Sequence, residues 1–315
     1  MQVVYVDAFN IEEPLKESCA CIGYFDGFHR GHQVLLDTCI QHAKKKNLAS
    51  ALITFDPDPW TVFKHEKQKH LMTLDDKIQF AQSYGFDIMY IIQFSLSFSQ
   101  LSIQQFHDVI HKLNVKCLVC GFDFRYGHKN SGDIHSLQEQ SLFDVTVIDS
   151  VNFSNLKIST SRIEPLILNG EIEQANDLLG YIYSISGTIE HGYKRGSTLI
   201  QIPTANLKTK EEYIIPCTGV YAGYVLIDKV YLPAMINIGC NPTFNNQNLT
   251  IEAHILDFNQ DIYEKHARFF FSNHIRKEIK FNSIDSLKKQ LLMDIETTKI
   301  LLKDDKLIKN TRKLF

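Results

Sequence analysis

Two histidines, His29 and His32, stand three residues apart directly after a glycine-rich turn. A short apolar run ends at this turn, and a helix-like segment begins beyond it. Because residues i and i+3 share one face of a helix, both imidazoles can point at the same ligand. A helix N-terminus also offers unpaired N–H groups and positive potential, which suit a phosphate. The pattern indicates a site for a nucleoside triphosphate, and its alternative is a strand–turn–helix junction that happens to contain histidines.

The loop Gly121–Gly127 follows another strand-like run and has a glycine at each end. It contains the carboxylate of Asp123, the ring of Phe124 and the guanidinium of Arg125 in succession. Aromatic residues in loops pack more often than they bind, yet a planar heterocycle also fits such a set.

Hydroxyl groups and a cation mark a predicted helix start at Ser159, Thr160 and Arg162. These groups are suited to phosphate oxygens. Taken alone, however, they are better interpreted as a helix N-cap beside a solvated arginine.

A second glycine-containing loop in the C-terminal half includes Gly192, Arg195 and Gly196. Backbone N–H groups and cations in such a loop can wrap the phosphates of a nucleotide.

Thr204 and Asn206 follow that loop and supply the hard oxygen ligands that suit Mg²⁺. Glu252 lies further on, between apolar neighbours in a strand-like run. Its carboxylate either faces solvent or points into a site as a base, and the pattern leaves both possibilities open.

The composition limits the classes of protein to consider. With 315 residues the chain is long enough for two domains, and 44% hydrophobic with 22% charged residues indicates a folded protein. A net charge of -3 provides no basic excess, so we expect no nucleic-acid partner. No apolar run approaches the ~20 residues that span a bilayer, and the first residues lack a secretory-signal pattern, so we expect no membrane association.

Seven cysteines are scattered through apolar segments, which favours free thiols in a reducing cytoplasm. Cys117 and Cys120 have the spacing of half a zinc site or of a redox pair. Their run is continuously apolar and no second pair follows, so we expect a buried strand there. The sequence does not indicate an oligomeric state.

Strand-like and helix-like segments alternate in the first part of the chain. The expected strands are Cys19–Gly23, Ala49–Phe55, Ile88–Phe94, Val115–Cys120 and Phe143–Ile148. Strands buried on both faces and separated by helices predict an α/β domain with a Rossmann-like parallel sheet. Ligands bind beyond the carboxyl ends of such strands, where the histidine turn and the 121–127 loop fall.

After Tyr183 the pattern changes to short, often alternating runs with turn residues between them. These runs are Ile185–Glu190, Gly219–Ile227, Val230–Ile238, Leu249–Leu256 and Arg268–Phe271. They predict an antiparallel β-barrel or sandwich, closed by a long helix with an apolar stripe from Ile284 to Leu302. We therefore expect two domains, at residues 1–183 and 184–315.

Taken in order, these motifs resemble those of the bacterial bifunctional riboflavin kinase/FAD synthetases over essentially the whole chain. The matching segments are Gly23–His32, Gly121–Gly127, Ile158–Ile163, Gly180, Pro203–Asn206 and Glu252–Phe258. The resemblance implies an α/β FMN adenylyltransferase domain and a riboflavin kinase-like antiparallel β-barrel with a terminal helix. It also implies ATP as co-substrate, Mg²⁺ as cofactor, and riboflavin, FMN and FAD as flavin substrates and products.

In the first domain, the resemblance implies that FMN attacks the α-phosphorus of ATP, giving FAD and pyrophosphate. His29 and His32 would stabilise the charge developing on the phosphates. Ser159, Thr160 and Arg162 would hold the outgoing pyrophosphate. The other implied contacts are Gly23, Phe25 and Gly31 for ATP, and Asp123, Phe124 and Arg125 for the flavin.

In the second domain, the resemblance implies transfer of the ATP γ-phosphate to riboflavin. Glu252 would take the hydroxyl proton as general base, and Thr204 and Asn206 would hold Mg²⁺. The loop residues implied in binding the ATP phosphates are Gly192, Arg195 and Gly196.

The chain departs from the family pattern at several positions. Asp58 stands where the family usually has histidine, and Gln201 and Glu264 stand where the kinase half usually has glycine. The last two favour an alternative function, in which only the adenylyltransferase is active and the barrel binds flavin or is structural. The retained base and metal residues of the barrel favour the bifunctional enzyme.

Overall fold

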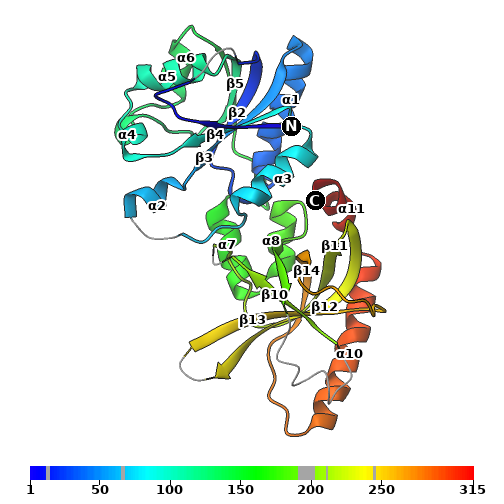
Figure 1. Ribbon diagram of the computed structural model, residues 1–315. Helices are drawn as coiled ribbons and strands as arrows, with labels where there is room; N and C mark the ends of the chain where they lie inside the picture. Colours follow the sequence, from blue (N-terminus) through cyan, green and yellow to red (C-terminus); the bar gives the residue numbers. More distant parts are fainter. Residues whose placement is uncertain (12–14, 65–67, 191–202, 211, 244–245) are drawn as a thin grey trace. The chain divides into compact units, whose positions relative to one another are not determined.

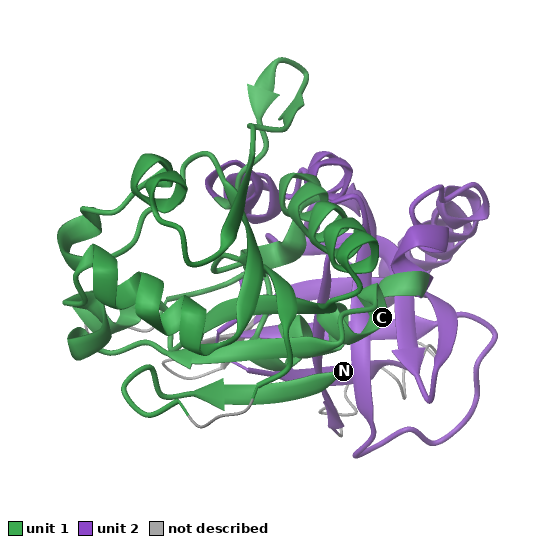
Figure 2. Cartoon of the chain, turned by 90° about the horizontal axis from the view of Figure 1, so that it is seen from above, with its two compact units in different colours: residues 1–160, 313–315 green, residues 161–312 purple. Residues whose placement is uncertain are grey.

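The computed structural model describes residues 1–11, 15–64, 68–190, 203–210, 212–243 and 246–315 (Figure 1). Contacts divide the chain into two compact units, which are coloured separately in Figure 2. The first unit is formed by residues 1–160 with 313–315, and the second by residues 161–312.

This division differs from the expected one after Tyr183, because two helices group with the second unit. They are α7 (Thr160–Asn169), whose residues belong to it from 161 on, and α8 (Ile172–Leu179). The buried Asn176 amide on α8 donates to the carbonyl oxygens of Phe271 and Ser272, at 2.9 and 3.2 Å. These contacts link α8 to a strand about a hundred residues away, which no local pattern in the sequence indicates.

Six strands form one parallel sheet at the centre of the first unit, as predicted. They are β1 (Gln2–Val6), β2 (Ser18–Ile22), β3 (Ala49–Asp56), β4 (Ile88–Gln93), β5 (Val115–Gly121) and β6 (Asp144–Ile148), in the order β1-β4-β3-β2-β5-β6. The edge strand β1 was not predicted. Chain order reverses between β2 and β5, which makes their carboxyl ends the expected ligand crevice of the sheet.

Helices pack on both faces of this sheet, with α1 (Arg30–Lys46) on one face and α5 (Ile103–Lys112) on the other. The unit also contains α2 (Pro59–Lys64), α3 (Leu74–Tyr84), α4 (Leu96–Ser99) and α6 (Ile134–Glu139). Short 3₁₀ turns, η1 (Asp26–Phe28) and η2 (His128–Asn130), and a small hairpin, β7 (Asn152–Phe153) with β8 (Leu156–Lys157), complete the unit. Thr73 and Ser102 begin α3 and α5 with reciprocal capping boxes, which fix where these helices start.

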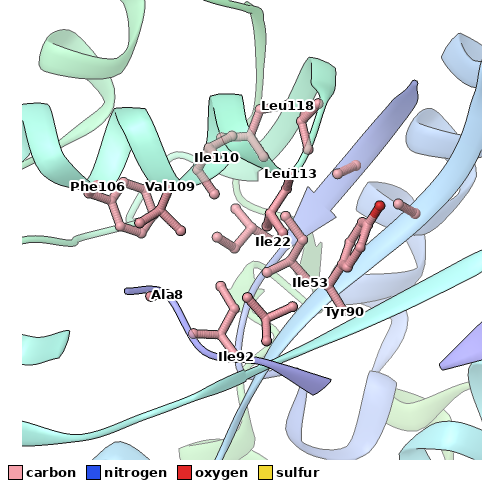
Figure 3. Packing of buried hydrophobic residues seen from close by; sticks show 14 of the residues in the cluster. Ala8, Ile22, Ile53, Tyr90, Ile92, Phe106, Val109, Ile110, Leu113 and Leu118 are labelled. Carbon is pink, nitrogen blue, oxygen red and sulfur yellow. The ribbon is translucent and has the colours of Figure 1, made fainter. Parts of the chain in front are cut away.

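One face of the sheet forms an apolar core with α5 (Figure 3). Ile22 and Leu118 from neighbouring strands pack there with Phe106 and Ile110 of the helix. Side chains alternate along a strand, so Cys19 and Cys117 fall on the opposite face, which α1 covers.

The second unit is a closed antiparallel barrel, as predicted. Its strands are β9 (Ser184–Glu190), β10 (Ala205–Thr209), β11 (Gly219–Ile227), β12 (Val230–Thr243), β13 (Asn246–Ile255) and β14 (His266–Arg276), in the order β10-β13-β12-β11-β14-β9. Gly223 is required where β11 and β14 shift register, because a Cβ there would lie 1.8 Å from the Phe270 carbonyl oxygen. Strand β10 was not predicted.

The predicted long helix is present as α10 (Ile284–Lys303), followed by α11 (Ile308–Leu314). Its apolar stripe is only partly buried, and its fully buried positions are polar: Asp294 and Thr298. Asp294 accepts bonds from Arg276 Nε and Nη2 of β14, at 2.9 and 2.7 Å. A buried ion pair therefore anchors α10 to the barrel. Among the described residues, no helix has the length and apolar character needed to cross a membrane.

Replacing Asp294 with alanine should destabilise the barrel, because Arg276 would lose its partner in a buried setting. The Asp294 side chain is 3% exposed, and we expect a loss of about 3 kcal/mol in urea unfolding. Glu296→Ala on the same helix removes an exposed pair with Lys299 and should cost under about 1 kcal/mol. Equal losses in the two variants would contradict the anchoring role.

Candidate functional sites

The histidine turn leaves the carboxyl end of β2 at the switch point of the sheet. Three of its residues have left-handed backbone: Phe25 (φ 53°), Gly27 (φ 78°) and Phe28 (φ 36°). Gly27 is required, because a Cβ there would also lie 2.5 Å from Leu71. The carboxylate of Asp26 accepts from the N–H groups of Leu71 and Met72, at 3.0 and 3.2 Å, and holds the turn against the segment before α3.

The turn brings His29 and His32 into direct contact. His29 is the N-cap of α1, and its Nδ1 accepts from the His32 N–H at 3.3 Å. The two rings are stacked, with centroids 3.7 Å apart and planes 14° apart. Among the described residues, the buried Nδ1 of His32 has no hydrogen-bond partner. The buried Phe25 ring packs edge-on against the His32 ring and so helps to hold His32 in place.

Both imidazoles are neutral at pH 7. Burial lowers the pKa of His29 from 6.5 to about 4. Burial and then the neighbouring His29 lower the pKa of His32 well below its ordinary value. Because the two rings are stacked, a positive charge on one imidazole disfavours a positive charge on the other.

A buried lysine, which the sequence analysis did not single out, lies behind this turn. Lys77 of α3 donates to the Tyr24 carbonyl at 2.9 Å, and its Nζ stands 3.5 Å from the centre of the Tyr24 ring. Burial lowers the pKa of Lys77 to about 8, against the opposing effect of nearby carboxylates. Its position on the apolar face of α3, beside Phe80 and Ala81, was the signal in the sequence.

His70 lies between two carboxylates at the same edge of the sheet. Its Nδ1 is 3.8 Å from Asp26 Oδ2, and its Nε2 is 3.4 Å from Asp58 Oδ2. The hydroxyl of Tyr24 is 3.3 Å from His70 Nε2. An imidazole therefore occupies this region although position 58 carries aspartate, and it comes from a different segment of the chain.

The segment before α7 also reaches the turn. Thr160 Oγ1 donates to the Asp26 carbonyl at 3.2 Å, and a Cβ on Gly31 would lie 3.7 Å from the Ile158 carbonyl and 3.1 Å from the His29 ring. Ser159 lies between Ile158 and Thr160 and is half-buried. Arg162 follows in the first turn of α7, within the second unit.

The 121–127 loop follows β5 across the switch point, and its three predicted flavin contacts have different surroundings. Exposed Asp123 pairs with Lys157 of β8. The half-buried Phe124 ring packs on Phe106 and Tyr126. Arg125 is exposed and pairs with Asp133 at 3.2 Å, so it belongs to the outer part of the loop. This packing favours a structural role for the Phe124 ring over binding of a planar heterocycle.

In the barrel, β10 and β13 bring three predicted residues together. Asn206 and Glu252 are register partners on these neighbouring strands, and Thr204 Oγ1 donates to Glu252 Oε2 at 3.4 Å. His254 Nδ1 donates to the Pro203 carbonyl at 2.9 Å, which holds the Thr204 segment against β13. Asn237 of β12 pairs with Glu252 from the other side and was missed by the sequence analysis.

Glu252 is half-buried, and burial raises its pKa while the bond from Thr204 lowers it. The carboxylate therefore lies among polar side chains at a partly desolvated position, not on a fully solvated face. A carboxylate with a raised pKa beside hydroxyl and amide oxygens can accept a proton and share a hard cation with its neighbours.

Several predicted kinase residues lie outside the described part of the chain, namely Gly192, Arg195, Gly196 and Gln201. Glu264 is described and has a left-handed backbone (φ 64°), with its N–H donating to the Ile189 carbonyl at 2.8 Å. A glycine suits this conformation, which accounts for the residue usual in the family pattern, and nothing in the structure explains the glutamate.

Comparisons with known proteins match each half of the chain to a family. Residues 11–162 match the family model described as FAD synthetase, and residues 179–302 match the one described as riboflavin kinase. A bifunctional riboflavin kinase/FMN adenylyltransferase of Listeria monocytogenes is 40% identical over 284 residues, covering 88% of this chain and 90% of that protein. The protein of the same name from Bacillus subtilis is 38% identical over 292 residues, covering 90% and 92%.

A solved structure also matches nearly the full length. It is described as a macrolide-efflux protein from Streptococcus pneumoniae and superposes with a TM-score of 0.87 at 32% identity. The match covers 95% of this chain and 99% of that one.

A parallel-sheet unit with a histidine pair at a helix start, joined to a barrel with a carboxylate among oxygen ligands, defines a two-domain phosphate-transfer protein. The chain belongs to the bifunctional riboflavin kinase/FMN adenylyltransferase family. The family resemblance predicted from the motifs is thereby confirmed.

The neutral state of His29 predicts that acid destabilises the first unit. Between pH 6.5 and 4 the unfolded chain binds a proton that folded His29 excludes, so stability falls as pH falls through this range. From pH 7.5 to 5 the contribution is about 2 kcal/mol. His29→Asn keeps an acceptor for the His32 N–H and should flatten the pH dependence measured by urea unfolding. Replacing the exposed His111 with asparagine is the control, and an identical pH dependence in both variants would contradict the prediction.

Proposed function

We propose that this chain makes FAD in two steps, phosphorylating riboflavin to FMN in the barrel and adenylylating FMN in the parallel-sheet unit. Family membership supports both activities. The observation that carries the proposal is that one chain assembles two separate sets of groups, the stacked His29–His32 pair and the Thr204–Asn206–Glu252 group.

In adenylyl transfer, a phosphate oxygen of FMN forms a bond to the α-phosphorus of ATP, and the bond to the bridging oxygen of pyrophosphate breaks. His29 and His32 gain protons as the triphosphate enters and stabilise the negative charge on the departing phosphates. The N-terminus of α1 adds its free N–H groups. Lys77 adds positive charge behind the turn. Positioning and electrostatics account for the rate, since the nucleophile is already anionic.

Other residues around the turn are proposed to contact ATP, pyrophosphate or the flavin. Gly23 and Gly31 allow the backbone to approach ATP, and Phe25 supports the histidine pair. Ser159, Thr160 and Arg162 at the start of α7 hold the pyrophosphate portion. Asp123, Phe124 and Arg125 of the 121–127 loop are proposed to contact the flavin.

In the kinase step, the riboflavin hydroxyl oxygen forms a bond to the γ-phosphorus of ATP, its proton passes to Glu252, and ADP leaves. The side-chain oxygens of Thr204 and Asn206 fit Mg²⁺, because hard oxygens from neighbouring strands converge beside a carboxylate. When bound, Mg²⁺ neutralises phosphate charge. Gly192, Arg195 and Gly196 are proposed to cover the phosphates.

All seven cysteines are free thiols, which supports a reducing, cytoplasmic setting. The proposed partners are small molecules: riboflavin, FMN, FAD and ATP. Neither a nucleic acid nor a membrane is required for either reaction.

Single substitutions should separate the two activities. His32→Asn should lower the rate of FAD formation from FMN by ~10²-fold or more and leave FMN formation from riboflavin unchanged. Glu252→Gln should lower kcat for FMN formation by ~10²–10⁴-fold and leave FAD formation unchanged. Flavin products separated by chromatography, with ATP and Mg²⁺ present, give both rates. Parallel loss of both activities in either variant would contradict the division.

The same assay tests the alternative that the barrel is inactive. Wild-type protein given riboflavin should accumulate FMN and FAD. If it converts added FMN to FAD but leaves riboflavin unchanged, only the adenylyltransferase is active and the barrel has a binding or structural role.

A further inference from the structure

A cluster of soft side chains lies on the α1 side of the parallel sheet, away from both proposed reactions. Cys19 of β2 and Cys117 of β5 are register partners on neighbouring strands and are fully buried. His42 of α1 faces them and is half-buried. The opposite face of the same strands is apolar, with Ile22 and Leu118 in the core of Figure 3.

The potential ligand atoms of this cluster are close enough to share one ion. The sulfurs of Cys19 and Cys117 and a ring nitrogen of His42 all lie within 4.8 Å of one another. Cys117 Sγ is 3.7 Å from His42 Nδ1. A tetrahedral zinc ion, with Zn–S of about 2.3 Å and Zn–N of about 2.0 Å, holds such a pair about 3.6 Å apart.

We propose that Cys19, Cys117 and His42 form a zinc site that fastens α1 to β2 and β5. Two thiolates and one imidazole are a ligand set typical of Zn²⁺. Thr146 Oγ1 of β6 lies 3.5 Å from His42 Nδ1 and marks the side from which a hydroxyl or a water completes the fourth position. The Cys117–Cys120 spacing is not the basis of the site, because Cys120 packs in the apolar core on the opposite face.

Among the described residues, the group of ligand atoms that lie within 4.8 Å of one another consists of these three residues, and the neighbouring thiols have carbonyl partners. Cys39 of α1 donates to the Cys19 carbonyl at 3.2 Å, and Cys21 donates to the Ala51 carbonyl at 3.8 Å. Cys39 is therefore a neighbour of the site and not one of its ligands.

Protons compete with zinc for the sulfur atoms of the two cysteines. The Cys117 thiol lowers the pKa of Cys19, but the Cys39 thiol and burial raise it further, to about 12. A hydrogen bond with Cys19, together with burial, raises the pKa of Cys117 well above its ordinary value. Lys46 of α1, which pairs with Asp144 of β6, lowers the pKa of both thiols. Zinc is bound by thiolates, so its binding to two thiols releases two protons.

The site is separate from the histidine pair although both use α1. His42 follows His29 by thirteen residues, which is about 20 Å along a helix. Occupancy is therefore expected to change the stability of the unit and to leave the rate of FAD formation from FMN unchanged.

Reduced full-length protein carrying Cys240→Ser, which removes an exposed thiol, is the material for the test. Titration with Co²⁺ should give one ion per chain with a thiolate-to-cobalt charge-transfer band, and Zn²⁺ should displace it. Zn²⁺ should release two protons per chain and raise the Tm. Cys117→Ala should weaken the Kd for Zn²⁺ by at least ~100-fold, more than loss of a residue that only supports a ligand.

The matched control is Cys120→Ala, which removes a buried thiol from the same strand but from the opposite face. It should leave the Kd for Zn²⁺ unchanged. If Cys117→Ala does not fold, His42→Asn replaces it, because His42 is a half-buried helix residue. This variant should weaken the Kd for Zn²⁺ in the same way. Absence of stoichiometric Zn²⁺ binding in the reduced protein, or equal Kd values in His42→Asn and Cys120→Ala, would overturn the proposal. Neither result bears on the two flavin activities, which are measured separately.

Discussion

The proposed adenylyl-transfer site depends on the hydrogen bonds of one buried residue, Asp26. Its carboxylate accepts from two N–H groups of the 71–72 segment, and its carbonyl accepts from Thr160. One residue therefore connects the turn after β2 with two segments that are distant in sequence. The left-handed backbone of Phe25 and Phe28, which flank Asp26 and Gly27, would be costly in isolation, and these bonds help to fix it. The positions of His29 and of the start of α1 follow from this arrangement.

The histidine pair contributes no positive charge to the free site. The imidazoles of His29 and His32 are neutral there, whereas Lys77, with a pKa of about 8, is mostly protonated at pH 7. A fully charged cluster of this kind would repel itself in a poorly solvated place. Phosphate brings the negative charge that makes protonation favourable. Affinity and proton uptake are therefore linked at this site.

Local patterns were sufficient to predict the parallel sheet and the barrel, except for the strands β1 and β10. The i, i+3 spacing indicated that His29 and His32 share a face, and alternation indicated most barrel strands. Contacts between distant segments were beyond such patterns: Lys77 reaches Tyr24 from another helix, and Asn176 joins α8 to β14.

Polar residues at buried positions were the second kind of feature that sequence patterns did not predict. The sequence predicted an apolar stripe on α10, whereas its fully buried side chains are Thr298 and Asp294, and Asp294 pairs with Arg276. Hydrophobic periodicity cannot locate a buried ion pair, because its partner lies on another element. Positions with left-handed backbone are similarly hidden unless glycine occupies them, and Glu264 is such a case.

The two proposed reactions need different protein groups because their nucleophiles differ. The phosphate of FMN is already anionic, so the first unit needs groups that accept negative charge and has histidines, a helix N-terminus and Lys77 at that place. The riboflavin hydroxyl carries a proton that must leave as its oxygen attacks phosphorus, so the barrel needs a base. Desolvation raises the pKa of Glu252, which strengthens it as a proton acceptor. The hydrogen bond from the Thr204 hydroxyl acts in the opposite direction and lowers this pKa.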